Sequence, residues 1–145
     1  MKHYPFELVR HSDLSYDYEF YDGDDKISAV LAHDGDGHYF AHYVRLVKGE
    51  DGRYTRFATM SHSSPNARKL FATLAHICLQ FGTIDNPDFE SINFDFVTDK
   101  VHSRIKIFLI LVSRIMPPEF ELFIDEEENV LYIMPRKKLK KMEKK

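Results

Sequence analysis

The sequence contains a single cysteine, Cys78, so no disulfide can form within the chain. The opening residues, MKHYPFELVR, lack the apolar stretch that a secretory signal needs. We therefore expect the protein to be cytoplasmic, in a reducing compartment. The longest apolar run, residues 105–112, is interrupted by Lys106 and is far shorter than the roughly 20 residues that cross a bilayer. We expect no membrane span.

The composition is otherwise that of a globular protein. The 145 residues match the size of one domain, and the apolar and charged fractions, 43% and 30%, are ordinary. The net charge is −3, but residues 136–145, RKKLKKMEKK, hold seven Lys or Arg against one Glu, which is +6 and leaves −9 on the rest. We expect one domain over residues 1–135 and a basic C-terminal tail over 136–145. An acidic body argues against a surface that binds duplex nucleic acid across the whole domain.

Short runs of β-forming residues separated by turn signals fill the first sixty residues. They predict strands over 4–11, 16–21, 26–33, 37–47 and 54–60, joined as an antiparallel meander. In the fourth strand, one face carries Tyr39, Ala41, Tyr43 and Arg45. The acidic groups Asp22, Asp24 and Asp25, then Asp34 and Asp36, then 125–128, are interpreted as turns on the acidic surface.

After Met60 the period of the apolar residues changes to that of a helix, predicted over residues 65–81. Ser64 suits the N-cap and Pro65 the first helical position, and Gly82 is expected to end the helix in a left-handed conformation. The remaining chain predicts a strand over 91–97, an apolar helix over about 100–116, and a hairpin of strands 119–124 and 130–134.

This order predicts an α+β fold, with a mixed, largely antiparallel twisted sheet and two main helices. The first helix is long enough to place the strands over 54–60 and 91–97 parallel in one sheet.

Ligands often bind beyond the carboxyl ends of parallel strands, here near residues 61–66 and 98–104. A helix N-terminus at that end favours an anion such as phosphate or carboxylate. The polar and basic side chains gathered there are His62, Arg68, Lys69, His102, Arg104 and Lys106. The alternative interpretation is ordinary polar helix ends.

Three other features have both a chemical and a structural interpretation. His33, Asp34, Asp36, His38 and His42 can be metal ligands, or can flank a tight hairpin turn as solvated side chains. Cys78 can be a nucleophile with His62, His76 or His102 as its base, or can pack in the helix stripe as a small apolar side chain. The basic tail can contact nucleic-acid phosphates or anionic lipid, or can be a solvated terminus.

The element order resembles the fold of the GNAT family of N-acetyltransferases. SHSSPNARKLFATL corresponds to the family's pyrophosphate loop and helix, SINFDF to the next strand, SRIKIFLILVSRI to the second helix, and FELFIDEEENVLYIMP to the final hairpin. The resemblance covers roughly residues 26–135. The pattern of Ala67, Phe71, Ala72 and Thr73, followed by residues 92–94 and Ser103-Arg104, is also similar to small GNAT-like proteins of tailed phages.

The resemblance implies a pyrophosphate or anion site at Ser63, Ser64, Asn66, Arg68 and Lys69, with His62, His102 and Arg104 as further binding residues. Two positions depart from the family pattern. The loop before the helix has no glycine, and Phe108 stands where the family offers a tyrosine as general acid. We therefore predict a non-catalytic, GNAT-like binding or accessory protein without a cofactor, phage-encoded and acting on a host protein in the host cytoplasm. The alternative is an acyl-CoA-dependent N-acyltransferase that holds acetyl-CoA through Ser63, Ser64, Arg68 and Lys69. The sequence does not determine the oligomeric state.

Overall fold

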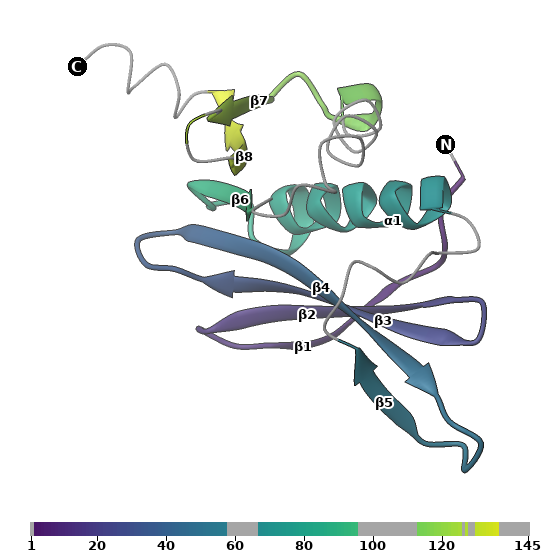
Figure 1. Ribbon diagram of the computed structural model, residues 1–145. Helices are drawn as coiled ribbons and strands as arrows, with labels where there is room; N and C mark the ends of the chain where they lie inside the picture. Colours follow the sequence, from purple (N-terminus) through teal and green to yellow (C-terminus); the bar gives the residue numbers. More distant parts are fainter. Residues whose placement is uncertain (1, 58–66, 96–112, 126, 128–129, 137–145) are drawn as a thin grey trace.

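The computed structural model describes residues 2–57, 67–95, 113–125, 127 and 130–136 (Figure 1). The strands in this part of the chain are β1 (Glu7–His11), β2 (Ser15–Asp22), β3 (Asp25–His33), β4 (His38–Lys48), β5 (Tyr54–Phe57), β6 (Ser91–Asp95), β7 (Phe120–Asp125) and β8 (Val130–Pro135). An α-helix, α1 (Ala67–Gln80), continues directly into a π-helical turn, η1 (Phe81–Asp85). These bounds lie within a few residues of the predicted ones wherever both can be compared.

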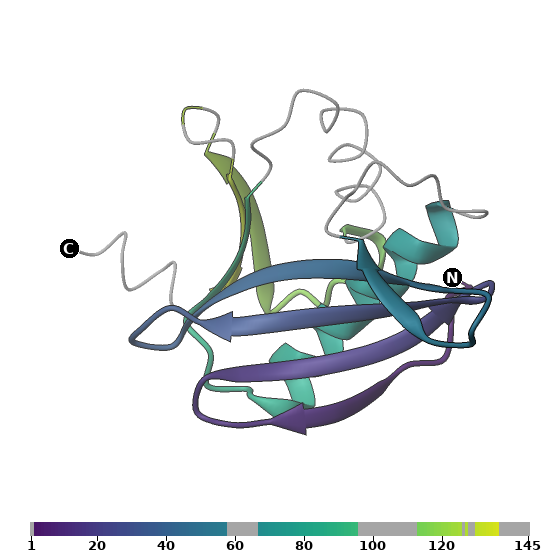
Figure 2. The ribbon, with the colours of Figure 1, turned by 60° about the horizontal axis from the view of Figure 1, so that its bottom comes forward.

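The strands form one sheet in the order β1-β2-β3-β4-β6-β8-β7, with β5 paired to β4 outside this path. Every pairing is antiparallel except that between β4 and β6. The predicted α+β class with a largely antiparallel sheet is therefore confirmed. Figure 2 shows that β6, β8 and β7 curve away from the plane of β1 to β4, while α1 lies against one face of the sheet.

The two halves of β4 have different partners. Its first residues, His38–Ala41, pair in parallel with β6, whereas Arg45–Lys48 pair antiparallel with β5. The prediction that the strand beginning at Tyr54 runs parallel to β6 is therefore wrong. A tight turn after β4, closed by the Gly49 N–H bond to the Arg53 carbonyl at 2.7 Å, folds β5 straight back along β4. Because β5 is the second arm of a hairpin, it must run antiparallel to β4.

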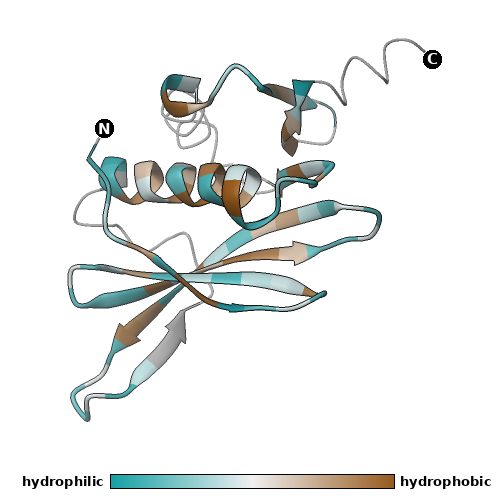
Figure 3. Ribbon diagram, turned by 180° about the vertical axis from the view of Figure 1, so that it is seen from behind, coloured by the Kyte–Doolittle hydropathy of each residue, from teal (hydrophilic) through white to brown (hydrophobic). Residues whose placement is uncertain are grey.

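Helix α1 is buried around most of its circumference. The predicted stripe includes Leu70 and Leu74, which are 3% and 8% exposed, and the same turns also bury Ala72 and Thr73 completely. The sheet side of this core consists of Tyr18, Phe20, Ile27, Ala29, Leu31, Tyr39, Ile92, Leu131 and Ile133. Figure 3 shows hydrophobic segments recurring along α1 and along the strands beneath it. The predicted N-terminal residues Ser64 and Pro65 lie outside the described part.

The end of the helix differs from the prediction at Gly82, which does not adopt a left-handed conformation. The chain instead continues as the π turn, in which the Asn86 N–H reaches the Phe81 carbonyl at 2.7 Å. Gly82 is needed there for space, since a Cβ would lie 2.8 Å from Phe89 Cε1 and 3.3 Å from Phe120 Cζ. The missing side chain therefore lets the helix end pack closely against two aromatic rings.

The second predicted helix lies almost entirely in residues 96–112, outside the described part. Ser113 to Ile115 are helical, which agrees with its predicted last turn, and Ile115 and Met116 pack against the core. At the N-terminus, the first strand begins at Glu7 rather than Tyr4. The segment before β1 instead contacts α1.

Candidate functional site

Of the residues predicted to bind an anion, only Arg68 and Lys69 lie in the part of the chain that the structure describes. Both are in the first turn of α1, where Arg68 is exposed and Lys69 places its Nζ 4.5 Å from the ring centre of Tyr4. Of the two described cations, Arg68 is therefore exposed to solvent and Lys69 lies over an aromatic face. His62, Ser63, Ser64, Asn66, His102 and Arg104 lie outside the described residues, as does Phe108.

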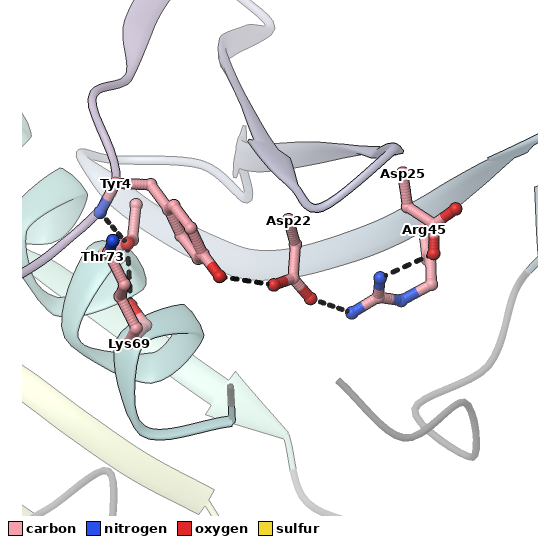
Figure 4. Close-up of polar contacts among 6 residues, drawn as sticks. All are labelled: Tyr4, Asp22, Asp25, Arg45, Lys69 and Thr73. Carbon is pink, nitrogen blue, oxygen red and sulfur yellow. Dashed lines mark hydrogen bonds and ion pairs between the residues drawn. The ribbon is translucent and has the colours of Figure 1, made fainter. Parts of the chain in front are cut away.

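A polar network lies beside this end of α1, on the face of the sheet that the helix covers (Figure 4). The Tyr4 hydroxyl donates to Asp22 Oδ1 at 2.7 Å, and Asp22 Oδ2 accepts from Arg45 Nη2 at 2.6 Å. Arg45 Nη1 donates to Asp25 Oδ2 at 2.9 Å. The residues come from four places in the sequence: the segment before β1, the end of β2, the start of β3, and β4.

The same network is attached to the helix through the backbone of Tyr4. The Tyr4 N–H donates to Thr73 Oγ1 at 2.8 Å, and the Thr73 hydroxyl donates to the Lys69 carbonyl at 2.7 Å. Thr73 is fully buried, so its hydroxyl needs these partners. The N-terminal segment is thereby hydrogen-bonded to α1 on one side and to the turn between β2 and β3 on the other.

The charged members of the network are removed from water. Arg45 is 2% exposed and Asp22 is 1% exposed. Burial by itself lowers the pKa of Arg45, but the hydrogen bonds and charges of Asp22 and Asp25 outweigh burial and raise it. Burial, and then the contact with Asp22, raise the pKa of Tyr4 to about 12. Tyr4 and Arg45 both keep their protons at neutral pH, so Tyr4 acts as a donor to Asp22.

The network favours a structural role over a catalytic one. Two guanidinium nitrogens of Arg45 are directed at carboxylates, which leaves the buried cation bound to partners within the fold. A buried charge is tolerated only when it is paired and hydrogen-bonded, and this one is both.

No pattern in the sequence predicts this network, and the interpretation of Asp22 as a turn residue on the acidic surface is wrong, because Asp22 is 1% exposed. One signal was present: Arg45 shares a strand face with Tyr39 and Ala41, which indicates a cation on the core side of the sheet. Nothing local to the sequence pairs that cation with Asp22 or connects Asp22 to Tyr4.

Two of the histidines around the turn between β3 and β4, His33 and His38, have hydrogen-bond partners within the protein. His33 Nε2 accepts from the Gly37 N–H at 3.2 Å, and His38 Nδ1 lies 2.6 Å from Ser91 Oγ. The turn residues Gly35, Asp36 and Gly37 all have positive φ angles. Among the described residues, no group of three or more His, Cys, Asp or Glu side chains is arranged to hold a metal ion.

Cys78 is a residue of α1 that lies in the core and is 5% exposed. Burial raises the pKa of its thiol to about 12, so the reactive thiolate is scarce at neutral pH. These observations favour packing over nucleophilic chemistry for this residue.

Comparison with protein-family models, with curated proteins and with solved structures gives no match for this chain. Within the described ranges, no helix has the length and apolar character needed to cross a membrane.

Proposed function

We propose that the protein is a non-catalytic binding protein built on a GNAT-like scaffold, and that it binds another protein instead of transferring an acyl group. Two similarities support the scaffold: a meander leads through a helix into β6, and a final hairpin follows. The resemblance to phage proteins extends the proposal to a phage-encoded accessory factor whose partner is a protein of the host cytoplasm.

The position of β5 carries the argument against acyl transfer. β4 and β6 pair in parallel over four residue pairs, His38–Ala41 with Ser91–Phe94. In such a scaffold, an extended thioester arm would enter beyond the end of this pairing. The edge of β4 beyond that stretch, Arg45–Lys48, is paired with β5. A ligand that used this edge would have to displace β5 and its ladder of backbone hydrogen bonds, each worth about 1 kcal/mol net.

The residues at the N-terminal end of α1 give a second argument against acyl transfer. The loop before α1 lacks the glycines that allow backbone N–H groups to approach a pyrophosphate closely. Among the described residues at that end, Arg45 is already bound by Asp22 and Asp25. Arg68, in the first turn of α1, is exposed, and it is the described residue on which the alternative of an atypical pyrophosphate site depends.

The test is titration calorimetry with acetyl-CoA, followed by a free-thiol release assay against a panel of amines. We expect neither binding heat nor thiol release. Thermal shift gives an independent measurement, because a ligand at 100 times its Kd stabilises a fold by about 2.7 kcal/mol.

Arg68→Ala is the diagnostic variant, and Arg53→Ala, at an exposed arginine in the turn between β4 and β5, is its matched control. Acetyl-CoA binding with thiol release that disappears in Arg68→Ala but persists in Arg53→Ala would overturn the proposal. That result would establish the acyltransferase alternative.

A further inference from the structure

The N-terminal segment, residues 2–6, is attached to the rest of the fold through a few side chains. The Tyr4 N–H donates to Thr73 Oγ1 of α1 at 2.8 Å, and the Tyr4 hydroxyl donates to Asp22 Oδ1 at 2.7 Å (Figure 4). The Tyr4 ring also stacks on that of Phe20, with 5.9 Å between the ring centres. Because this segment pairs with no strand in the described part of the chain, side-chain contacts of this kind hold it in place.

Two histidine rings meet where this segment contacts α1. The ring centres of His3 and His76 lie 4.0 Å apart, and the ring planes are tilted by 31°. His3 Nδ1 donates to the Tyr4 carbonyl at 2.8 Å, since a carbonyl can only accept. His76 Nε2 is buried and has no hydrogen-bond partner among the described residues. A second proton on the His76 ring makes both of its nitrogens donors, and the buried Nε2 then lacks an acceptor.

The charged groups around the two rings supply no counter-ion. No carboxylate of the described residues forms an ion pair or a hydrogen bond with either ring. On α1 the cation on the same side is Lys69, two turns before His76, and on the sheet the Asp22 carboxylate is already ion-paired with Arg45. Burial, and then the charges of His3 and the amino terminus, lower the pKa of His76 below its usual value of 6.5.

We propose that the contact between His3 and His76 is an acid-sensitive latch: a proton taken up by His76 favours detachment of residues 2–6 from α1 while the sheet remains folded. In the detached state the His76 ring is hydrated and takes up the proton at an ordinary pKa. Because the closed state binds this proton more weakly, detachment becomes more frequent as the pH falls below about 6.5 towards the lowered pKa. One linked proton changes the equilibrium by at most about tenfold per pH unit.

Detachment changes the surface of the protein, because the segment covers two aromatic rings of the core. The Tyr4 ring centre lies 5.9 Å from that of Phe20, and the Phe6 ring centre lies 6.2 Å from that of Tyr18. Phe20 and Tyr18 are 2% and 0% exposed in the closed structure. The latch therefore links acid to the exposure of apolar surface beside α1.

The test is hydrogen exchange of the Tyr4 amide, followed by NMR at about pH 7.5 and about pH 5.5. This N–H is bound to Thr73 in the closed state, so it exchanges when the segment detaches. After correction for the intrinsic exchange rate at each pH, its protection should fall by about threefold to tenfold at the lower pH. Low urea concentrations should leave this protection unchanged, because local detachment exposes little surface, whereas the protection of β2 and β3 amides should decrease.

His76→Gln is the diagnostic variant, and His11→Gln, at an exposed histidine on β1, is its matched control. In His76→Gln the protection of Tyr4 should differ by less than about twofold between the two pH values. In His11→Gln it should change as in wild type. His3→Gln removes the other ring and should reduce the pH dependence, so it serves as the second variant if His76→Gln does not fold. Circular dichroism verifies the fold of each variant.

Three results would overturn the latch. The first is a protection of Tyr4 that is equal at both pH values, and the second is a pH dependence that persists unchanged in the variants of His76 and His3. The third is a urea dependence equal to that of the β2 and β3 amides, which would show that acid weakens the whole fold and not this contact. Acetyl-CoA binding or turnover would overturn the proposed function and leaves the latch unaffected.

Discussion

Tyr4 and Asp22 share a 2.7 Å hydrogen bond that connects the segment before β1 to the end of β2. Asp22 is 1% exposed, and the same carboxylate is ion-paired with Arg45. The bond therefore joins the N-terminal segment to a buried charge, which makes the first residues of the chain part of the core structure.

Tyr4→Phe removes only the hydroxyl of this bond. Because the buried Asp22 carboxylate then loses one of its donors, we expect a loss of about 1–3 kcal/mol in the free energy of unfolding, measured with urea. Tyr21→Phe is the control, since Tyr21 is 53% exposed. Equal effects of the two substitutions would show that the hydrogen bond does not stabilise the fold.

Arg45→Met leaves Asp22 charged and buried without its cation, and we expect a loss of about 3–5 kcal/mol. Adding Asp22→Asn removes the uncompensated charge, so the double variant should be more stable than Arg45→Met alone. Denaturant unfolding of wild type, Arg45→Met, Asp22→Asn and the double variant measures the coupling. Simple addition of the two losses would argue against an interaction between these side chains.

Leu74→Ala creates a cavity in the buried face of α1, where Leu74 is 8% exposed. The expected loss is about 2–5 kcal/mol. Leu14, which is 77% exposed in the turn before β2, is the matched position, and Leu14→Ala should change stability by no more than about 0.5 kcal/mol. A loss below about 1 kcal/mol for Leu74→Ala would mean that α1 packs less tightly than the structure indicates. Leu111, which the apolar pattern of the second predicted helix also places in the core, lies outside the described residues.

His76 should make stability depend on pH. Its ring centre lies 4.0 Å from that of His3, and its buried Nε2 has no hydrogen-bond partner among the described residues. Burial, and then the charges of His3 and the amino terminus, lower the pKa of His76 below its usual value of 6.5. The unfolded chain therefore takes up this proton more readily than the folded protein.

Stability should accordingly decrease as the pH falls below about 6.5 towards the lowered pKa. Urea unfolding on either side of this pH measures the decrease, which should be smaller in His76→Gln. His11→Gln, at an exposed histidine on β1, should leave the decrease unchanged. The same pH dependence in wild type and His76→Gln would show that another group causes the effect.

Local signals predict the elements well where neighbours in sequence are also neighbours in space. β2, β3 and β4 pair consecutively as antiparallel hairpins, so their alternating patterns and turns identify both their bounds and their inward faces. The helical spacing of the apolar residues likewise predicts α1. In each case the determining contacts lie within one hairpin or one helical turn.

The errors concern partners that are distant in sequence. The pattern of β6 predicts a strand, but not that β4 is its parallel partner. A glycine at position 82 is typical of a helix end. The structure shows that glycine is needed there because Phe89 and Phe120, from other segments, pack against it. The network of Tyr4, Asp22, Asp25 and Arg45 likewise forms only when the sheet brings these residues together from separate segments.

The short contact between β4 and β6 also has a consequence for cooperativity. It comprises four residue pairs, His38 to Ala41 with Ser91 to Phe94, and it is the ladder that joins the meander to the C-terminal hairpin in the described part of the chain. The meander is built from sequential hairpins, and closing their short loops has a small entropic cost. In contrast, β6, β8 and β7 are held to the meander by this one parallel ladder and by packing against α1. Native-state hydrogen exchange should therefore separate two foldons, with amides of β7 and β8 exchanging through sub-global openings at lower free energy than those of β2 and β3.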